Sequence, residues 1–221
     1  MEIKRKILKL TLTIIIVVLL LNTPINHVES DIPNEPHRAD AMWIEPPLIN
    51  ATGLTVGYKF NVTVWINLTQ ECAGWQFYML YDKGLLNATR CGYTAGDKSD
   101  FFKNITTIPV SPTLDGPHNK THAYVLHGES WLMGDFRSPG YGSLAWVEFE
   151  IIAEPPFTCI LDISSEHHPP TSKTYALNPQ QEEIPLLTYD TTVIPEFSSW
   201  LAVIFLSLTL FAALLTAKRK K

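Results

Sequence analysis

Three histidines lie close together in the sequence and are the first residues that suggest metal chemistry: His118, His122 and His127. Histidine nitrogens are common zinc ligands. Residues 122–127, however, alternate like a β-strand, and the odd separation of His122 and His127 places them on opposite faces of it. They cannot easily converge on one ion, and no Cys-x-x-Cys or Cys/His spacing supplies another ligand set. We therefore expect no metal site and no cofactor; calcium in the acidic loops is left open.

Two carboxylates raise the question of glycoside hydrolysis, which uses a pair of Asp or Glu side chains. Glu148 and Glu150 share one face of a predicted strand with Trp146, which could serve as a sugar platform. The exposed face of an antiparallel sheet normally carries such polar residues, however. The chain also has no Gly-x-Ser-x-Gly motif and no phosphate-binding loop. We therefore expect a protein that is not an enzyme.

The Asn-x-Thr motif occurs six times, never with proline in the middle, which is more often than chance placement predicts. It predicts N-glycosylation of an exported protein. The alternative is that threonine, which favours strands, merely falls beside turn-forming asparagine. The candidate asparagines are Asn50, Asn61, Asn67, Asn87, Asn104 and Asn119.

The three cysteines are interpreted in the light of export, which permits disulfides. Cys72 and Cys91 lie on either side of a predicted turn at 82–84, so a hairpin could bring them together, and we expect them to form a disulfide. Cys159 alternates with apolar neighbours and is expected to be a buried free thiol.

The strand expected to organise the domain is Gly74–Asp82. Its apolar residues Trp75, Phe77, Met79 and Tyr81 alternate with Gln76, Tyr78 and Leu80, so it should bury one face in a core. The second face is only partly polar, which makes it a candidate surface for a partner. Asp82-Lys83-Gly84 predicts a turn, and Leu85 begins the predicted return strand.

Further strands are expected at 41–45, 58–69, 101–108, 122–127, 145–151, around Cys159 and at 187–194, separated by loops rich in proline and glycine. In the 58–69 strand, Asn61 and Asn67 fall on the face opposite the apolar residues and should point away from the core. No convincing helix precedes Phe197. We therefore predict one all-β sandwich domain over 41–194, after a linker at 31–40.

Both ends of the chain predict contact with a membrane. Residues 1–30 combine four basic residues with the uncharged run 10–21, which is typical of a signal peptide cut after Ser30; an uncleaved anchor is the alternative. Residues 197–217 carry no charge and would span about 31 Å as a helix, before the basic cluster 218–221. That cluster should stay in the cytoplasm, so the domain should lie on the extracellular face.

The charge between these ends is strongly negative. Residues 10–217 contain nine basic and 21 acidic residues, a net charge of −12. A surface of this sign repels phosphate backbones, so we expect no nucleic-acid partner.

The C-terminal end resembles the PEF-type sorting signal of archaeal surface proteins, in which a Pro-Glu-Phe motif precedes a membrane helix and a basic cluster. Pro195, Glu196 and Phe197 match the motif. The resemblance implies that a membrane transpeptidase cuts near the motif and transfers the protein to another anchor.

The order of three blocks resembles the cohesin family: residues 57–64, residues 74–82 continued by 85–89, and residues 142–149. The resemblance implies a jelly-roll sandwich of about nine strands without catalytic activity. Cohesins bind dockerin modules through an exposed sheet face that includes the central strand, which would here present Gln76, Tyr78 and Leu80, with Trp146. The alternative partner is a cell-envelope polysaccharide, bound on exposed rings among Trp65, Tyr78, Trp131 and Trp146.

Overall fold

The computed structural model describes residues 39–50, 55–95, 97, 99–154, 157–163 and 173–194. The predicted signal peptide, the Pro195–Phe197 motif and the predicted transmembrane helix lie outside these residues. Within them there are strands, turns and loops but no helix, so no described helix is long and apolar enough to cross a membrane. The predicted all-β class is confirmed for this part of the chain.

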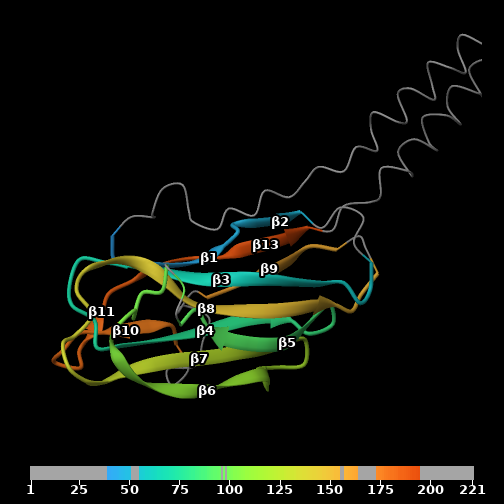
Figure 1. The fold of residues 1–221 in the computed structure, drawn as a ribbon. Coiled ribbons are helices and arrows are strands. Elements are labelled where there is room, and N and C mark those ends of the chain that lie inside the picture. The colour runs from blue at the N-terminus through green and yellow to red at the C-terminus, as the bar shows by residue number, and fades with distance from the viewer. Residues whose placement is uncertain are drawn as a thin grey trace, which may run out of the picture. The chain divides into compact units, whose positions relative to one another are not determined.

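Two five-stranded sheets face each other (Figure 1). The first sheet has the order β12-β1-β3-β8-β5, with the bounds Leu187–Tyr189, Ala41–Glu45, Lys59–Leu68, Gly140–Ile151 and Leu86–Tyr93. The second sheet has the order β11-β10-β4-β7-β6, with the bounds Glu183–Ile184, Tyr175–Leu177, Gly74–Asp82, His122–Met133 and Thr106–Pro117. A smaller sheet joins β2 (Leu48–Asn50), β13 (Thr191–Ile194) and β9 (Cys159–Leu161).

The core lies between the two large sheets and is built from alternate residues of their central strands. Side chains two apart share a face, so each strand contributes one inward row. In β4 the row is the predicted one, and Trp75, Phe77, Met79 and Tyr81 are all at most 2% exposed. Inward rows of β3 and β8 complete the core with Val62, Val64, Ile66, Leu68, Ala145, Val147, Phe149 and Ile151.

The predicted hairpin after β4 is wrong. The turn itself forms, and the Gly84 amide donates to Asp82 Oδ1 at 2.8 Å. The chain then crosses to the other sheet, where β5 pairs with β8, while β4 pairs with β7 and β10. The apolar side chains of β5 would be buried equally well if β5 belonged to either sheet. The alternating pattern alone therefore does not identify the strand with which β5 pairs.

The expected Cys72–Cys91 disulfide is absent for the same reason, and all three cysteines are free thiols. Cys72 pairs through its backbone with Arg137 and is fully buried, whereas Cys91 lies on β5 in the other sheet. Burial raises the pKa of both thiols to about 12. Cys159 is 3% exposed, so the prediction of a buried free thiol is confirmed.

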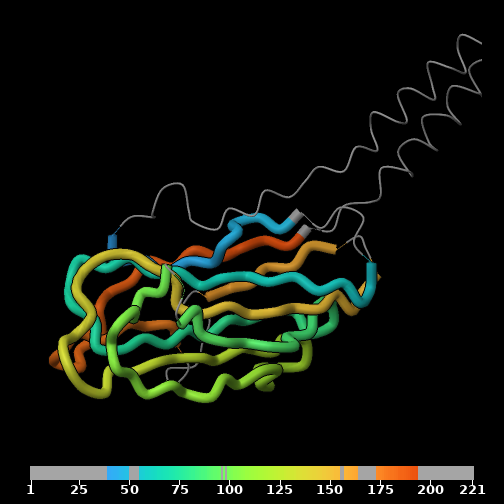
Figure 2. Tube along the Cα trace, viewed as in Figure 1, coloured from blue at the N-terminus to red at the C-terminus, as the bar shows by residue number. Residues whose placement is uncertain are grey.

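The β6–β7 hairpin is longer than predicted. Its two strands run antiparallel from Thr106 to Met133 around a turn at 118–121, over residues expected to be mainly loop (Figure 2). Tyr93 ties this hairpin to β5: its hydroxyl accepts from the Val110 amide at 2.7 Å and faces the carbonyls of Val110 and Gly128 at 2.9 and 2.8 Å. The side chain therefore closes one edge of the sandwich.

Candidate interaction face

The outer face of the second sheet is the surface on which the cohesin resemblance places a partner, and its side chains form rows across the strands. The strand register aligns Ile108 with Ser130 and Gly74, and the next row aligns Val110 with Gly128 and Gln76. A third row runs through Thr113, Leu126 and Tyr78. The face therefore passes from exposed β6 at one edge to the central strand β4.

Tyr78 was expected to be exposed on this face, and that expectation is wrong because the side chain is 1% exposed. Its ring stacks on Tyr124 with centroids 4.4 Å apart, and its hydroxyl lies 3.1 Å from His118 Nδ1. Its backbone amide donates to the Thr174 hydroxyl at 3.1 Å. Burial raises the pKa of Tyr78 to about 12, so this phenol stays neutral and acts as a packing residue.

Leu80 and Gln76 are also engaged within the domain. Leu80 is 7% exposed, so its expected exposure is wrong, and its backbone exchanges two hydrogen bonds with Asp162 at 2.8 and 3.0 Å. The Gln76 carboxamide is half-buried and donates to the Lys173 carbonyl at 3.0 Å. These contacts complete the free edge of β4, which makes it a true central strand.

Trp146 does not lie on this face. It belongs to β8 in the first sheet, so the four predicted partner-binding residues are not brought together. The Arg90 guanidinium sits over its ring at 5.6 Å from the centroid. Gly92 packs against the ring from the neighbouring strand, where an added Cβ would come within 2.9 Å of an indole carbon.

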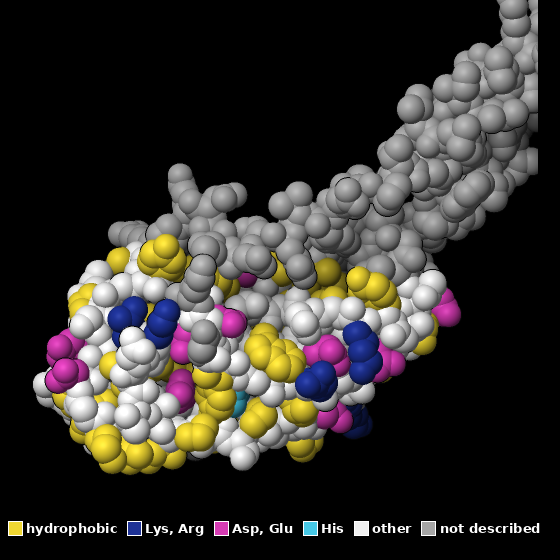
Figure 3. Space-filling view, viewed as in Figure 1, with side chains coloured by type: hydrophobic (Ala, Val, Ile, Leu, Met, Phe, Trp, Pro, Cys, Tyr) yellow, Lys and Arg dark blue, Asp and Glu magenta, His cyan; other side chains and the backbone are white. Residues whose placement is uncertain are grey.

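The exposed apolar side chains of the second sheet lie instead at its β6–β7 end. Ile108, Val110, Leu132 and Met133 are 48%, 51%, 42% and 58% exposed. Figure 3 shows hydrophobic side chains gathered at the lower left, where Figure 1 places β6 and β7. We call Ile108, Val110 and Leu132, which fall in the outward rows, the β6–β7 patch; Met133 follows Leu132 and falls in the opposite row. Sequence analysis missed it because this segment was assigned largely to loops; the signal was the alternation of Ile108 and Val110 around Pro109.

Two buried glycines lie next to this patch. Gly74 and Gly128 fall in the rows of Ile108 and Val110 and point outward with Ser130 and Gln76. A Cβ at Gly128 would meet the Trp75 carbonyl oxygen at 2.8 Å. The close approach of the two strands therefore requires glycine there, and the backbone beside the patch is left without a large side chain.

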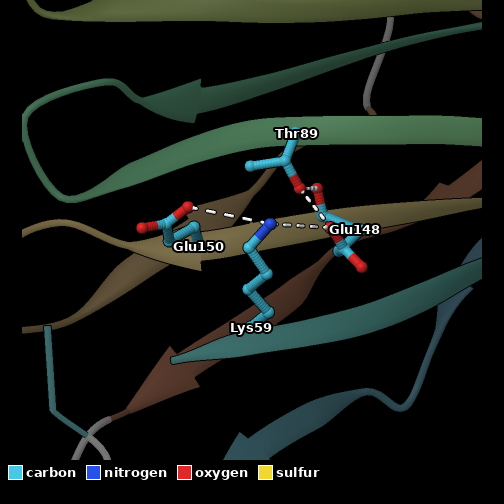
Figure 4. Close-up of polar contacts among 4 residues, drawn as sticks. All are labelled: Lys59, Thr89, Glu148 and Glu150. Atoms are coloured by element: carbon cyan, nitrogen blue, oxygen red, sulfur yellow. Dashed lines mark hydrogen bonds and ion pairs between the residues drawn. The ribbon is translucent and has the colours of Figure 1, made fainter. Parts of the chain in front are cut away.

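Part of the outer face of the first sheet carries a polar network, which Figure 4 shows. Lys59 lies between the two carboxylates, with Nζ 3.3 Å from Glu148 Oε1 and 3.9 Å from Glu150 Oε2. The Thr89 hydroxyl donates to Glu148 at 2.5 Å and, with Lys59, lowers the pKa of that carboxyl. A glycosidase acid needs a raised pKa, so this pair is suited to a surface ion network and not to hydrolysis.

Most sequon asparagines are accessible. Asn61 and Asn87 are exposed on the outer face of the first sheet, directly across from Glu148 and Glu150. Asn67 is half-buried on the same face. Asn104 and Asn119 are exposed in loops, and the Asn119 side chain accepts from the Thr121 amide at 2.8 Å. The side chain of Asn50 lies outside the described residues.

His122 and His127 lie on opposite faces of β7. His127 points inward and is 1% exposed, while His122 points outward and is half-buried, as the alternation predicts. Both ring nitrogens of His127 lack a partner among the described residues, and burial lowers its pKa to about 4. The described part of the chain contains no group of three or more His, Cys, Asp or Glu residues close enough to hold a metal ion.

No protein-family model matches the sequence, and no curated protein is similar to it. Solved structures that are similar to the chain include cohesins. One is a non-cellulosomal cohesin from the hyperthermophilic archaeon Archaeoglobus fulgidus, with 13% identity and a TM-score of 0.47 over 71% of this chain and 91% of that one. Another is the second type II cohesin module of the ScaA scaffoldin of Acetivibrio cellulolyticus, with 17% identity and a TM-score of 0.49 over 70% and 90%.

A third similar structure is the third ScaC cohesin of Acetivibrio cellulolyticus, solved in complex with the ScaB dockerin. Its identity is 11% and its TM-score 0.48, over 70% of this chain and 98% of that one. With TM-scores below 0.5, these likenesses do not assign the chain to a family.

Proposed function

We propose that this chain is a non-catalytic interaction module on the cell surface, and that the β6–β7 patch binds a dockerin-like protein partner. The observation that carries the proposal is that three large apolar side chains, each more than 40% exposed, fall in neighbouring outward positions at one end of one hairpin. Contiguous exposed apolar surface is uncommon on soluble domains and marks sites of protein contact.

The sequence resemblance supports the same function. Its three blocks correspond to β3, to β4 with the start of β5, and to β8, so they include central strands of both sheets. The face that the resemblance implies is the outer face of the second sheet. The proposed contact is shifted on that face from Tyr78 and Leu80 on β4 to Ile108 and Val110 on β6, because the former pair is buried.

Surface display is part of the proposal and rests on the sequence. The predicted signal peptide, the six sequons and the basic cluster after the uncharged 197–217 segment all favour an exported domain held by a C-terminal anchor. The Pro195–Phe197 motif favours later processing of that anchor.

Polysaccharide binding on flat aromatic platforms is the weaker alternative. Trp65 and Tyr78 are 3% and 1% exposed, so neither ring is open to a sugar. Arg90 covers Trp146, and Trp131 packs against Phe136 with ring centroids 4.5 Å apart. None of the four expected platforms is therefore a bare exposed ring.

The test compares the full-length chain with the double variant Ile108→Ser, Val110→Ser as bait for secreted proteins of the source cell. We expect the variant to lose a partner that wild type captures, with purified partner binding weakened about 100-fold, because two exposed anchors are removed. The matched control is Ile160→Ser with Leu187→Ser, which removes two side chains 55% and 47% exposed elsewhere. Equal binding by the test variant and wild type would remove the β6–β7 patch from the proposal.

A further inference from the structure

A pocket of about 400 Å³ lies at one end of the first sheet, separate from the β6–β7 patch. Trp65 and Tyr141 come from the outward rows of β3 and β8, and Arg137 comes from the loop before β8. Asp100, Lys103 and Asn104 come from the segment that leads into β6. The volume falls within the range of small-molecule sites, about 300–1,000 Å³.

The segment that forms one wall is firmly held. Phe101 and Phe102 are 0% and 4% exposed and anchor it in the core. The Ser143 amide donates to the Ser99 carbonyl at 2.7 Å, and the Phe101 amide donates to the Ser143 carbonyl at 2.9 Å. A Cβ at Gly142 would lie 2.7 Å from the Phe101 Cα, so glycine permits this close pairing. The pocket is therefore largely pre-formed.

The lining combines a ring with hydrogen-bonding groups. The Tyr141 side chain is 47% exposed and lies directly across from Asn67 in the strand register, while Trp65 forms a buried wall. Asn104 is exposed, with its backbone at φ 67°. Aromatic faces pack against the C–H groups of sugar rings, and carboxamides bond to hydroxyls. This composition differs from the purely apolar β6–β7 patch.

The side chains that line the pocket carry a net positive charge, although the chain as a whole is acidic. Lys103 is exposed, and Arg137 stacks its guanidinium on Phe101 at 4.8 Å from the ring centroid. The Arg137 Nε atom is buried and has no partner among the described residues. Asp100 is the one carboxylate of the lining, and its Oδ1 accepts from the Phe102 amide at 3.0 Å. The lining therefore contains two cationic side chains, Lys103 and Arg137, and one carboxylate, Asp100, which already accepts a backbone hydrogen bond in a turn.

We propose that this pocket binds an anionic saccharide, with Tyr141 packing against the sugar ring and Lys103 and Arg137 pairing with its carboxylate or sulfate. Charge-assisted bonds from guanidinium and ammonium groups recognise such anions. A saccharide of this chemistry has two possible sources: a polysaccharide outside the molecule, or a glycan carried by this chain at Asn104, which lines the pocket, or at Asn67, which lies across from Tyr141. The site goes beyond the proposed protein-binding function.

The first experiment uses the full-length chain produced without N-glycans and titrated with tetragalacturonate, with cellotetraose as the neutral probe. We expect the acidic probe to bind and the neutral probe to bind at least about tenfold more weakly. Tyr141→Ala should weaken acidic-probe binding about tenfold, and Lys103→Gln should weaken it less while reducing its dependence on salt. Tyr58→Ala is the matched control, because that tyrosine is 45% exposed and does not line the pocket.

The second experiment repeats the titration with the glycosylated chain. Unchanged binding identifies an external saccharide as the ligand. If binding is lost in the glycosylated chain and returns only in Asn67→Gln or in Thr106→Ala, which removes the Asn104 sequon, the ligand is the chain's own glycan. Equal binding of both probes to the unglycosylated chain, or wild-type affinity in Tyr141→Ala with unchanged thermal unfolding, overturns the proposal. Ile108→Ser with Val110→Ser should leave the titration unchanged, which separates this site from the protein-binding proposal.

Discussion

The two outer faces of the sandwich differ in charge, in Asn-x-Thr sequons and in the side chains that they leave exposed. The first sheet presents the Lys59, Glu148 and Glu150 network, with the sequon asparagines Asn61 and Asn87 beside it. The strands of the second sheet contain no sequon asparagine, and their β6–β7 end exposes apolar side chains. A face that carries glycans is shielded from proteins, so the comparison favours the second face for a partner.

The largest effect should come from moving a glycan to the second face. Val110→Asn with Pro112→Thr creates the sequence Asn-Ser-Thr at an exposed edge strand, and a glycan there should abolish partner binding. Asn61→Gln with Asn87→Gln, on the first face, should leave binding unchanged. Capture of the purified partner by glycosylated protein measures both.

The matched control for this exchange is Val110→Asn with Pro112→Ala, which changes the same positions without a sequon. It should bind more weakly than wild type but better than the glycosylated variant. If a glycan at position 110 leaves capture at the level of this control, the second face is not the binding face.

The second prediction concerns how the free energy of unfolding changes at acidic pH. His127 is buried beneath the second sheet, and its pKa falls from 6.5 to about 4 because burial disfavours the charged ring. The unfolded chain therefore binds more protons than the folded chain between these values, and stability falls as pH drops from 6.5 towards 4. The full effect is roughly 3 kcal/mol. Burial raises the pKa of nearby Glu129, which acts in the opposite direction.

Chemical denaturation between pH 4 and 7 checks this response. His127→Leu should flatten the dependence of the free energy of unfolding on pH, while His122→Leu, which changes a half-buried outward ring, should keep the slope. A slope that survives in His127→Leu would assign the acid sensitivity to other groups.

A smaller effect is expected at Tyr93, which connects the two faces. Its hydroxyl bonds to backbone groups of Val110 and Gly128 beneath the β6–β7 patch. Tyr93→Phe should lower the free energy of unfolding by about 1–3 kcal/mol, because the Val110 amide loses its partner. Hydrogen exchange at Val110 should accelerate in this variant, and Tyr58→Phe, at an exposed ring, should change neither quantity. Unchanged exchange at Val110 would show that the Tyr93 bond does not protect this edge.

Sequence analysis correctly predicted which residues face the core where the alternation within a single strand determines it. The inward row of β4 follows from alternation alone, and so does the opposite orientation of His122 and His127. It failed to predict the burial of side chains that are covered by segments distant in the sequence. Tyr78 is buried because Tyr124 and His118 cover it, and Leu80 is engaged by Asp162 from beyond β9. Neither contact leaves a local signal, since each depends on which strands pair.

The same reason explains the missed sites. The strand predicted at 101–108 ended at Ile108, because Val110 lies between prolines, which suggest a loop; β6 is an edge strand, however, where proline is tolerated. The pocket beside Tyr141 joins β3, β8 and two loops, so no stretch of sequence contains it. Each of these features becomes visible only once the order of strands in the sheets is known.

The smallest effect should come from the ion network of the first face. Lys59→Met removes contacts of 3.3 and 3.9 Å to two carboxylates, but its side chain is 49% exposed. Solvent screens such pairs, so the free energy of unfolding should fall by at most about 1 kcal/mol, and the difference from wild type should shrink in high salt. Thermal unfolding at low and high salt measures it, with Lys83→Met as a control away from the network. A larger loss that salt does not reduce would mean that Lys59 acts by packing, and the first face would then be more than a solvated surface.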